Sequence, residues 1–174
     1  MNKPLLAVLL FVAALAPAAP AAAPRIVVFK AERRLEFQQD GRIVKTCRVG
    51  LGTHPAGHKL RQGDGRTPEG IYYVCVKNAH SQYYLSLGLS YPSSGDAARA
   101  VAAGAITQGE STAIARANSN RSTPPWNTAL GGEIFIHGHG SGSDWTLGCI
   151  ALDDADMKEL FNLVSKGTAV EVRP

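Results

Sequence analysis

A histidine and a cysteine stand twelve residues apart in the last third of this 174-residue chain, joined by a loop rich in glycine and serine. His137 ends an apolar run that begins at Ile134, and Cys149 opens a second apolar run. A cysteine thiol becomes a good nucleophile near neutral pH when a neighbouring base takes its proton. We therefore interpret Cys149 as a candidate nucleophile for acyl transfer and His137 as its base.

Two glycines beside this pair complete the expected chemistry. No carboxylate lies next to His137, so we expect the backbone carbonyl of Gly138 to orient the imidazole ring. Backbone N–H groups around Gly148 are candidates for binding the oxyanion of a tetrahedral intermediate, and a glycine there leaves room for it. Taken singly, the cysteine fits a core position and the histidine a strand end, but their pairing favours catalysis.

The other histidines of the chain offer alternative roles. His139 is a rival base, since it points the same way as His137 along an extended segment. We prefer His137 because it ends the buried strand, and the alternative for His139 is a polar loop position. A zinc site built from these two with His54 and His58 is disfavoured, because no pair of closely spaced cysteines accompanies them.

Strands are expected to carry most of the chain, which places it in the mainly β (α+β) class. The pattern predicts strands over residues 26–29, 35–38, 43–44, 47–51, 71–76, 83–91, 134–136 and 169–172. A hairpin turn is predicted at Asp40-Gly41. Two short helices, over residues 93–104 and 108–118, form a helical insert (residues 93–127) before the His/Cys segment, either as scaffold or as a substrate-shaping flap.

One further helix is predicted near the C-terminus, from about residue 153 to 165. Asp153 and Asp154 are candidates for capping its first turn. Its apolar residues fall on one stripe that would face the core. They are Met157, Leu160, Phe161 and Val164.

Residues 1–23 are typical of a secretory signal peptide, and residues 24–174 of one domain. Lys3 precedes an apolar segment over residues 4–15, and alanines and prolines follow it up to residue 23. An uncleaved anchor is the alternative, although the segment is short for a membrane span. We expect a protein secreted across the inner membrane that works in the periplasm or cell envelope.

Charge and cysteine content narrow the partners and the core. The formal net charge is +4 without a block of basic residues, which argues against nucleic acid and suits a polyanionic wall or envelope. Cys47 and Cys75 lie in separate strand-like segments. They fit either a disulfide in an oxidising compartment or two buried core thiols.

Three blocks of the sequence resemble the L,D-transpeptidase (YkuD-type) family, and together they cover about residues 25–173. The first block pairs Ile136-His137-Gly138 with Thr146-Leu147-Gly148-Cys149. The second starts at Lys59 and includes Gly63-Asp64-Gly65-Arg66-Thr67-Pro68-Glu69-Gly70-Ile71-Tyr72. The third is Ser90-Tyr91-Pro92.

The resemblance implies an L,D-transpeptidase-type β-sandwich with its site in a cleft under a loop, and a peptidoglycan cysteine acyltransferase. Cys149 would attack the carbonyl at the L-centre of diaminopimelate in a tetrapeptide stem, and His137 would protonate the departing D-alanine. The thioester would then pass to an amine on a second stem peptide or on an attached protein. Acylation of Cys149 by carbapenems is expected, and neither a metal nor an organic cofactor is implied.

Candidate substrate contacts lie around the catalytic pair. Trp145, Thr146 and His139 belong to the connecting loop, whereas Thr67 and Tyr83 come from earlier in the chain. For Thr67 and Tyr83, a core or turn role is the alternative.

The sequence departs from the family pattern at two positions. Many members have a histidine before the Gly-Cys pair and an arginine or asparagine shortly after it, where this chain has Leu147 and Ala151. The resemblance therefore assigns no residue to a substrate carboxylate, and it leaves the acyl acceptor open between an amine and water. The alternative functions are a peptidoglycan hydrolase (endopeptidase or amidase) on the same scaffold and a wall-binding module with a degenerate site.

Overall fold

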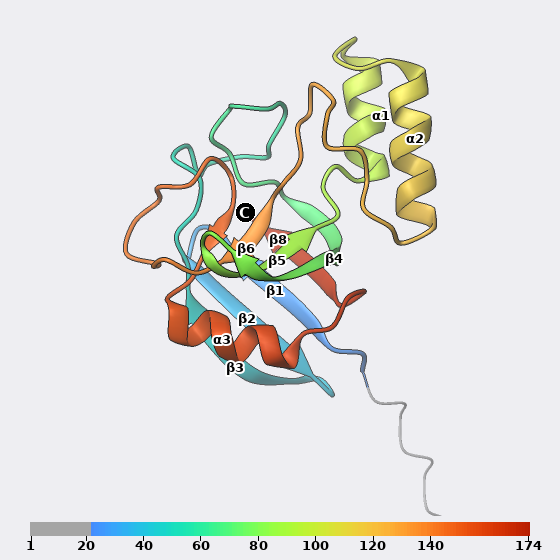
Figure 1. The fold of residues 1–174 in the computed structure, drawn as a ribbon. Coiled ribbons are helices and arrows are strands. Elements are labelled where there is room, and N and C mark those ends of the chain that lie inside the picture. Colours follow the sequence, from blue (N-terminus) through green and yellow to red (C-terminus); the bar gives the residue numbers. More distant parts are fainter. Residues whose placement is uncertain (1–21) are drawn as a thin grey trace, which may run out of the picture.

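Eight strands form one continuous sheet in the computed structural model of this chain, which describes residues 22–174 (Figure 1). In chain order they are β1 (Arg25–Phe29), β2 (Arg34–Gln39), β3 (Arg42–Arg48), β4 (Gly70–Ser81), β5 (Tyr84–Leu89), β6 (Phe135–His137), β7 (Ile150–Ala151) and β8 (Ala169–Arg173). Across the sheet the order is β3-β2-β1-β8-β4-β5-β6-β7. The helices of the described part are α1 (Ser94–Ala102), α2 (Gln108–Ser119) and α3 (Asp154–Leu163).

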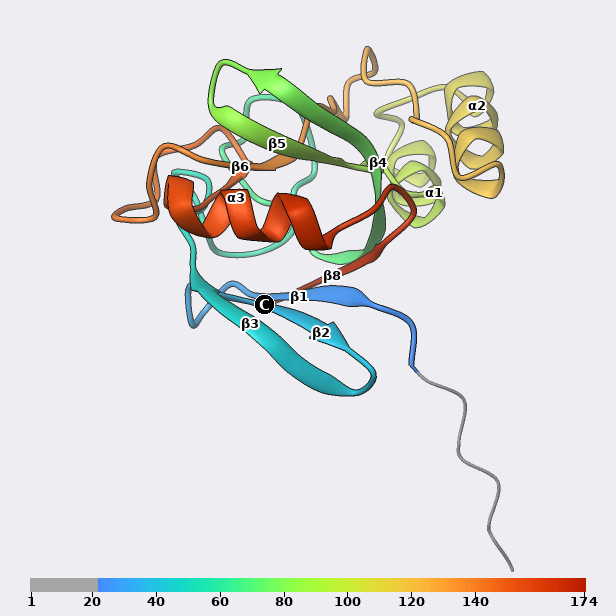
Figure 2. The ribbon, with the colours of Figure 1, turned by 60° about the horizontal axis from the view of Figure 1, so that its bottom comes forward.

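The sheet folds over on itself along the long strand β4. Residues 70–73 of β4 pair with β8, whereas the part from Val74 to Ser81 pairs with β5. Register shifts after Val74 and after Asn78 interrupt the pairing with β5, and such irregularities bend a strand. Figure 2 shows the two layers that result: β4, β5 and β6 on one side, β1, β2 and β3 on the other, and α3 between them. The expected mainly β fold is confirmed.

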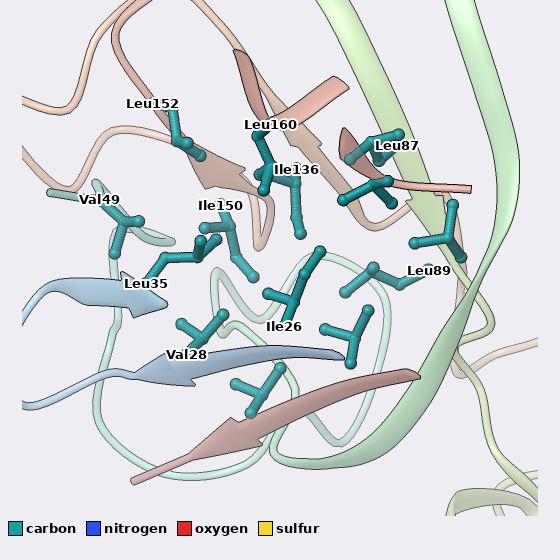
Figure 3. Close-up of a cluster of buried hydrophobic side chains, with 14 of the residues drawn as sticks. Ile26, Val28, Leu35, Val49, Leu87, Leu89, Ile136, Ile150, Leu152 and Leu160 are labelled. Atoms are coloured by element: carbon teal, nitrogen blue, oxygen red, sulfur yellow. The ribbon is translucent and has the colours of Figure 1, made fainter. Parts of the chain in front are cut away.

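Aliphatic side chains from both layers fill the space between them. Figure 3 shows Ile26 and Val28 of β1 and Leu87 and Leu89 of β5 pointing into one cluster. All four are fully buried, so the cluster is closed to water. Burial of this kind stabilises the fold by about 25 cal/mol for each Å² of apolar surface removed from water.

The third helix covers this core with the stripe that its sequence predicted. Met157, Leu160 and Val164 are buried, and Phe161 packs against the same cluster while partly exposed. The helix contacts β5 and β6, and β6 is the strand that ends at His137. Packing of α3 therefore helps to position the candidate base.

The first two helices form a separate unit with a small core of its own. Ala97, Ala100 and Ile114 pack together there with Ile106 and Leu130. Figure 1 shows the pair to one side of the sheet. Both helices begin with a capping box. The hydroxyl of the N-cap residue accepts from the backbone N–H three residues later, and the carboxylate of that later residue accepts from the backbone N–H of the N-cap residue. The boxes are Ser93/Asp96 for α1 and Thr107/Glu110 for α2.

Cys47 and Cys75 are both buried and unpaired. They lie on β3 and β4, and the strands β2, β1 and β8 come between these two in the sheet. The structure therefore selects the second interpretation, two buried core thiols.

The predicted signal peptide, residues 1–23, lies almost entirely outside the described residues and stays a prediction. Within residues 22–174, no helix combines the length and the apolar character that crossing a membrane requires.

Candidate active site

Two very short strands bring His137 and Cys149 together. β6 and β7 run parallel, with Ile136 opposite Ile150 and His137 opposite Ala151. Figure 3 shows Ile136 and Ile150 pointing into the core. Neighbouring side chains of a strand point to opposite faces, so His137 and Cys149 both lie on the other face.

A cavity of about 470 Å³ opens on that face, and His137 and Cys149 both line it. A second cavity, of about 410 Å³, lies on the side of β4 and β5 and is lined by Asn78 and Ser86. The two cavities share the histidine and the cysteine, together with Tyr83 and Glu133. The candidate nucleophile is therefore approached from two sides.

His137 is held in the tautomer that a general base needs. Its Nδ1 lies 2.7 Å from the carbonyl oxygen of Gly138, the orienting contact expected from the sequence. A carbonyl only accepts hydrogen bonds, so Nδ1 carries the proton and Nε2 keeps a free lone pair. Burial lowers the pKa of His137, while the hydrogen bond to Gly138 acts in the opposite direction. The ring is therefore neutral at neutral pH.

Cys149 is held as a thiol between two backbone groups. Its Sγ accepts a hydrogen bond from the N–H of Phe135 at 3.4 Å, and it donates to the carbonyl of Glu133 at 3.5 Å. Burial raises the pKa of the thiol, while the Phe135 N–H and the positive charge of Lys59 act to lower it. The resting pair consequently consists of a thiol and a neutral imidazole.

Thr146 closes the turn that leads into Cys149. Its hydroxyl donates to the Cys149 carbonyl at 2.8 Å and accepts from the Gly148 N–H at 3.1 Å. The Gly148 amide is therefore already used, and the amides of Leu147 and Cys149 remain as the candidate oxyanion donors. Gly148 has φ of +131°, and a Cβ there would lie 2.6 Å from the carbonyl oxygen of Arg66, so only glycine fits.

Thr67 supports the same turn from behind. It is fully buried, accepts from the Gly52 N–H at 3.1 Å, and lies 3.5 Å from the carbonyl of Cys149. It is not part of the cavity lining. Its contacts are those of a residue that positions Cys149 rather than one that touches a substrate.

An aromatic wall stands over His137. The ring of Tyr83 stacks on the imidazole with centroids 4.7 Å apart, and Trp145 approaches edge-on at 5.6 Å. Both aromatic residues are 37% exposed and line the cavity, which places them where a substrate would pass. His139 is exposed and outside the cavity lining, with its ring edge-on to Tyr83 at 5.7 Å. The structure thus places His137, not the rival His139, beside Cys149.

The start of α3 holds the loop that follows His137. Asp153 occupies the N-cap position but makes no side-chain cap; its Oδ1 accepts instead from the Ser141 N–H at 2.9 Å. Asp154 likewise accepts from the His139 N–H at 2.8 Å. The expected capping role is therefore corrected, because these carboxylates bond loop amides far away in sequence.

Three other contributions to the site were not predicted. Asp144 ties the loop to the rest of the fold, since it pairs with Arg33 at 2.7 Å and accepts from the Leu51 N–H at 2.9 Å. Glu133 and Lys59 line the cavity with Cys149. Of these, Lys59 had a signal in the sequence, because it opens the block of residues that contains its partner Asp64.

The histidines of the rejected zinc arrangement are spread apart. His58 accepts from the Glu69 N–H at 2.9 Å and pairs with Asp96 at 2.9 Å, which ties it to α1. Among residues 22–174, no three histidine, cysteine, aspartate or glutamate side chains gather in a way that could hold a metal ion.

Comparison with known proteins places this geometry in a family context. The family model described as the L,D-transpeptidase catalytic domain, YkuD, matches residues 23–172. No curated protein matches the chain.

Several solved structures share the fold. The helical cell shape determining protein Pgp2 from Campylobacter jejuni is 23% identical with a TM-score of 0.60, over 87% of this chain and 47% of Pgp2. An L,D-transpeptidase from Xylanimonas cellulosilytica is 15% identical with a TM-score of 0.52, over 91% of this chain and 65% of the other. Bd1075 from Bdellovibrio bacteriovorus is 18% identical with a TM-score of 0.54, over 88% of this chain and 48% of Bd1075. This chain thus spans about half the length of Pgp2 and of Bd1075.

Proposed function

This chain belongs to the L,D-transpeptidase (YkuD) catalytic domain family, and on that premise we propose that it is a peptidoglycan L,D-transpeptidase that works through a Cys149 acyl-enzyme. The observation that carries the proposal is the shared cavity, which His137 and Cys149 both line, while Nδ1 of His137 is bound to the Gly138 carbonyl and Nε2 is left as the basic nitrogen. The family acts on peptidoglycan stem peptides. We infer the same substrate class here, in the periplasm or cell envelope.

The first half-reaction forms a thioester. Sγ of Cys149 attacks the carbonyl carbon at the L-centre of diaminopimelate while Nε2 of His137 takes the thiol proton. The carbonyl oxygen becomes an oxyanion next to the amides of Leu147 and Cys149. When the intermediate collapses, the C–N bond to D-alanine breaks, and His137 returns the proton to the leaving amine.

The second half-reaction transfers the acyl group. An amine of a second stem peptide, or of an attached protein, attacks the thioester carbonyl and gives its proton to His137. The bond to Sγ breaks, and the proton passes back to the thiol. Two cavities that meet at Cys149 support a reaction with separate donor and acceptor, since each substrate has a side from which to approach.

Replacing the nucleophile tests this proposal. We expect Cys149→Ala to lose both turnover of tetrapeptide muropeptides and the mass increase that a carbapenem adds to the wild-type chain. Circular dichroism and thermal denaturation should match the wild type, because the side chain is small and lies beside a cavity. Turnover that persists in Cys149→Ala would overturn the assignment.

The mass of the product decides between transfer and hydrolysis. A cross-linked dimer with release of D-alanine supports transfer. Monomers released from an L,D-linked dimer would instead support the hydrolase alternative. Binding to isolated cell wall without any thioester at Cys149 would support the wall-binding alternative.

A further inference from the structure

Lys59 is a buried cation in the wall of the Cys149 cavity. Its side chain is 3% exposed and yet lines that cavity. Lysine is almost never fully buried unless it is paired. Among the described residues that line the cavity, Lys59 is the cation and Glu133 the anion. A buried lysine in this position therefore indicates a specific role for its ammonium group.

The partner of Lys59 holds its side chain in place. Asp64 accepts from Nζ of Lys59 at 2.9 Å and also from the backbone N–H groups of Leu60, Arg61 and Arg66 at 2.8 to 3.1 Å. Although burial acts to raise the pKa of Asp64, these hydrogen bonds lower it to about 2. The carboxylate is thus ionised and its negative charge is shared among four donors.

The ammonium group has capacity left for a ligand. A lysine ammonium offers three N–H donors, and one is used by Asp64. Leu147, which also lines the cavity, is apolar and 78% exposed, and Ala151 after the nucleophile is buried. Lys59 is thus the positive charge that faces the same cavity as the thiol.

We propose that Lys59 is the specificity-determining residue that binds a free carboxylate of the substrate in the Cys149 cavity. The proposal rests on the proposed function for the identity of that substrate. A tetrapeptide stem offers three such groups: the carboxylate of the departing D-alanine, the carboxylate at the D-centre of diaminopimelate and the α-carboxylate of the γ-linked D-glutamate. All three have the same chemistry, so the experiment must separate them.

Alkylation of Cys149 tests the charge without any natural substrate. Iodoacetate and iodoacetamide react with the same thiolate, so the ratio of their rate constants is independent of the thiol pKa. We expect Lys59→Gln to lower the iodoacetate to iodoacetamide ratio by about fivefold or more, because one positive charge near the thiol is lost. Mass analysis of the peptide that contains Cys149 separates its reaction from that of Cys47 and Cys75.

Lys59→Arg is the matched control, because it keeps the charge. A ratio that stays near the wild-type value in Lys59→Arg and falls in Lys59→Gln supports the proposal. An unchanged ratio in Lys59→Gln, or an equal fall in both variants, overturns it, since the effect would then not follow the charge.

Amidated substrates identify the carboxylate. One tetrapeptide carries D-alaninamide, a second carries an amide at the D-centre, and a third carries an amide in place of the α-carboxylate of D-glutamate. For the wild type we expect KM to rise about tenfold or more with one of the three amides, and for Lys59→Gln the acid and that amide should give equal KM. Equal KM values of the wild type for the acid and all three amides would overturn the proposal. Failure of the wild type to form any thioester would instead overturn the proposed function, while the alkylation ratio would still report on Lys59.

Discussion

Burial drives the pKa values of the two candidate catalytic residues apart. It raises the pKa of the Cys149 thiol and lowers the pKa of His137. Both shifts favour the uncharged form of the pair over a thiolate and an imidazolium. The proton then moves only when the substrate is attacked, which makes His137 a general base in the strict sense.

The pH dependence of acylation should show this neutral pair. His137 must be unprotonated to accept the thiol proton, and its pKa lies below the ordinary value of 6.5. As the pH falls, the rate is therefore retained down to that lowered pKa and is lost below it. We expect the acid limb of carbapenem acylation, followed by intact mass, to have its midpoint below pH 6.5.

His137→Gln is the control for this profile. Without the base, the reaction depends on the small fraction of Cys149 that has lost its proton to water. This fraction is low at neutral pH, because burial raises the pKa of Cys149 above its ordinary value of 9.0. The variant should react about 10²–10⁴-fold more slowly at neutral pH, with a rate that climbs through the alkaline range. A wild-type midpoint above pH 6.5, or the same profile in His137→Gln, would contradict a neutral pair.

At the scale of single residues, the sequence is informative where a residue belongs to a local pattern. His137 and Cys149 stand at the ends of apolar strands, and the contact with Gly138 follows from the lack of a nearby carboxylate. The stacking of Tyr83 on His137 could not be predicted, because it depends on the pairing of β5 with β6. Lys59 likewise gains meaning only when the fold brings it to the cavity of Cys149.

At the scale of elements, periodicity predicted most strands and all three helices of the described part. What it could not predict is how β6 and β7 pair, because three and two residues carry no usable period. The role of Asp153 and Asp154 was also missed. An aspartate at the start of a helix is expected to accept hydrogen bonds from the first amides of that helix. Only the tertiary structure shows that these two carboxylates accept from amides of the loop after His137 instead.

The junction between β6 and α3 leads to a prediction at this scale. Gly138 is a glycine because of crowding: a Cβ would lie 2.3 Å from Oδ1 of Asp154 and 3.1 Å from the carbonyl oxygen of Tyr83. Gly138→Ala should push the Asp154 carboxylate off the His139 N–H and shift the carbonyl that orients His137. We expect carbapenem acylation to slow by about ten- to a hundredfold, since small misplacements of catalytic groups are costly.

A double-mutant cycle shows whether the two residues act through one contact. Asp154→Ala removes both the loop contact and the obstacle, so it should slow acylation less than Gly138→Ala does. In that background Gly138→Ala should cost little more, because the closest clash is gone. If the effects of the two substitutions on the acylation rate are additive in the double variant, the two residues do not act through a shared contact. Thermal denaturation of each variant controls for unfolding.

At the scale of the whole molecule, the chain has two cores of unequal importance for the site. The larger lies between the layers of the curled sheet and includes Ile136, the neighbour of His137. The smaller is built around α1 and α2 and includes Ile114 of α2 together with Leu130, which follows the helical insert. The sequence left the insert open between scaffold and flap. The structure shows that α1 and α2 contribute no residue to the lining of the Cys149 cavity.

The insert nevertheless leads directly into one rim of the cavity, which begins at Gly131. This rim has ties that do not depend on the helices. Tyr91 donates from its hydroxyl to the Leu130 carbonyl at 3.3 Å, and the Gln62 N–H donates to the Ala129 carbonyl at 3.0 Å. Trp126 packs against Gly132, where a Cβ would lie 2.1 Å from its ring. Tyr91 follows β5, Gln62 follows Lys59, and Trp126 lies after α2 at the end of the insert, so none of these contacts comes from α1 or α2 themselves.

Ile114→Ala should therefore loosen the helices without harming the site. Ile114 is fully buried, and removing its side chain should cost about 2–5 kcal/mol within the smaller core. We expect faster hydrogen exchange in α1 and α2, with the exchange of β6 and the carbapenem acylation of Cys149 unchanged within about twofold. Ile136→Ala, in the larger core, is the matched comparison and should lower both the melting temperature and the acylation rate. If Ile114→Ala slows acylation as strongly as Ile136→Ala does, the helices shape the cavity and the independence of its rim is disproved.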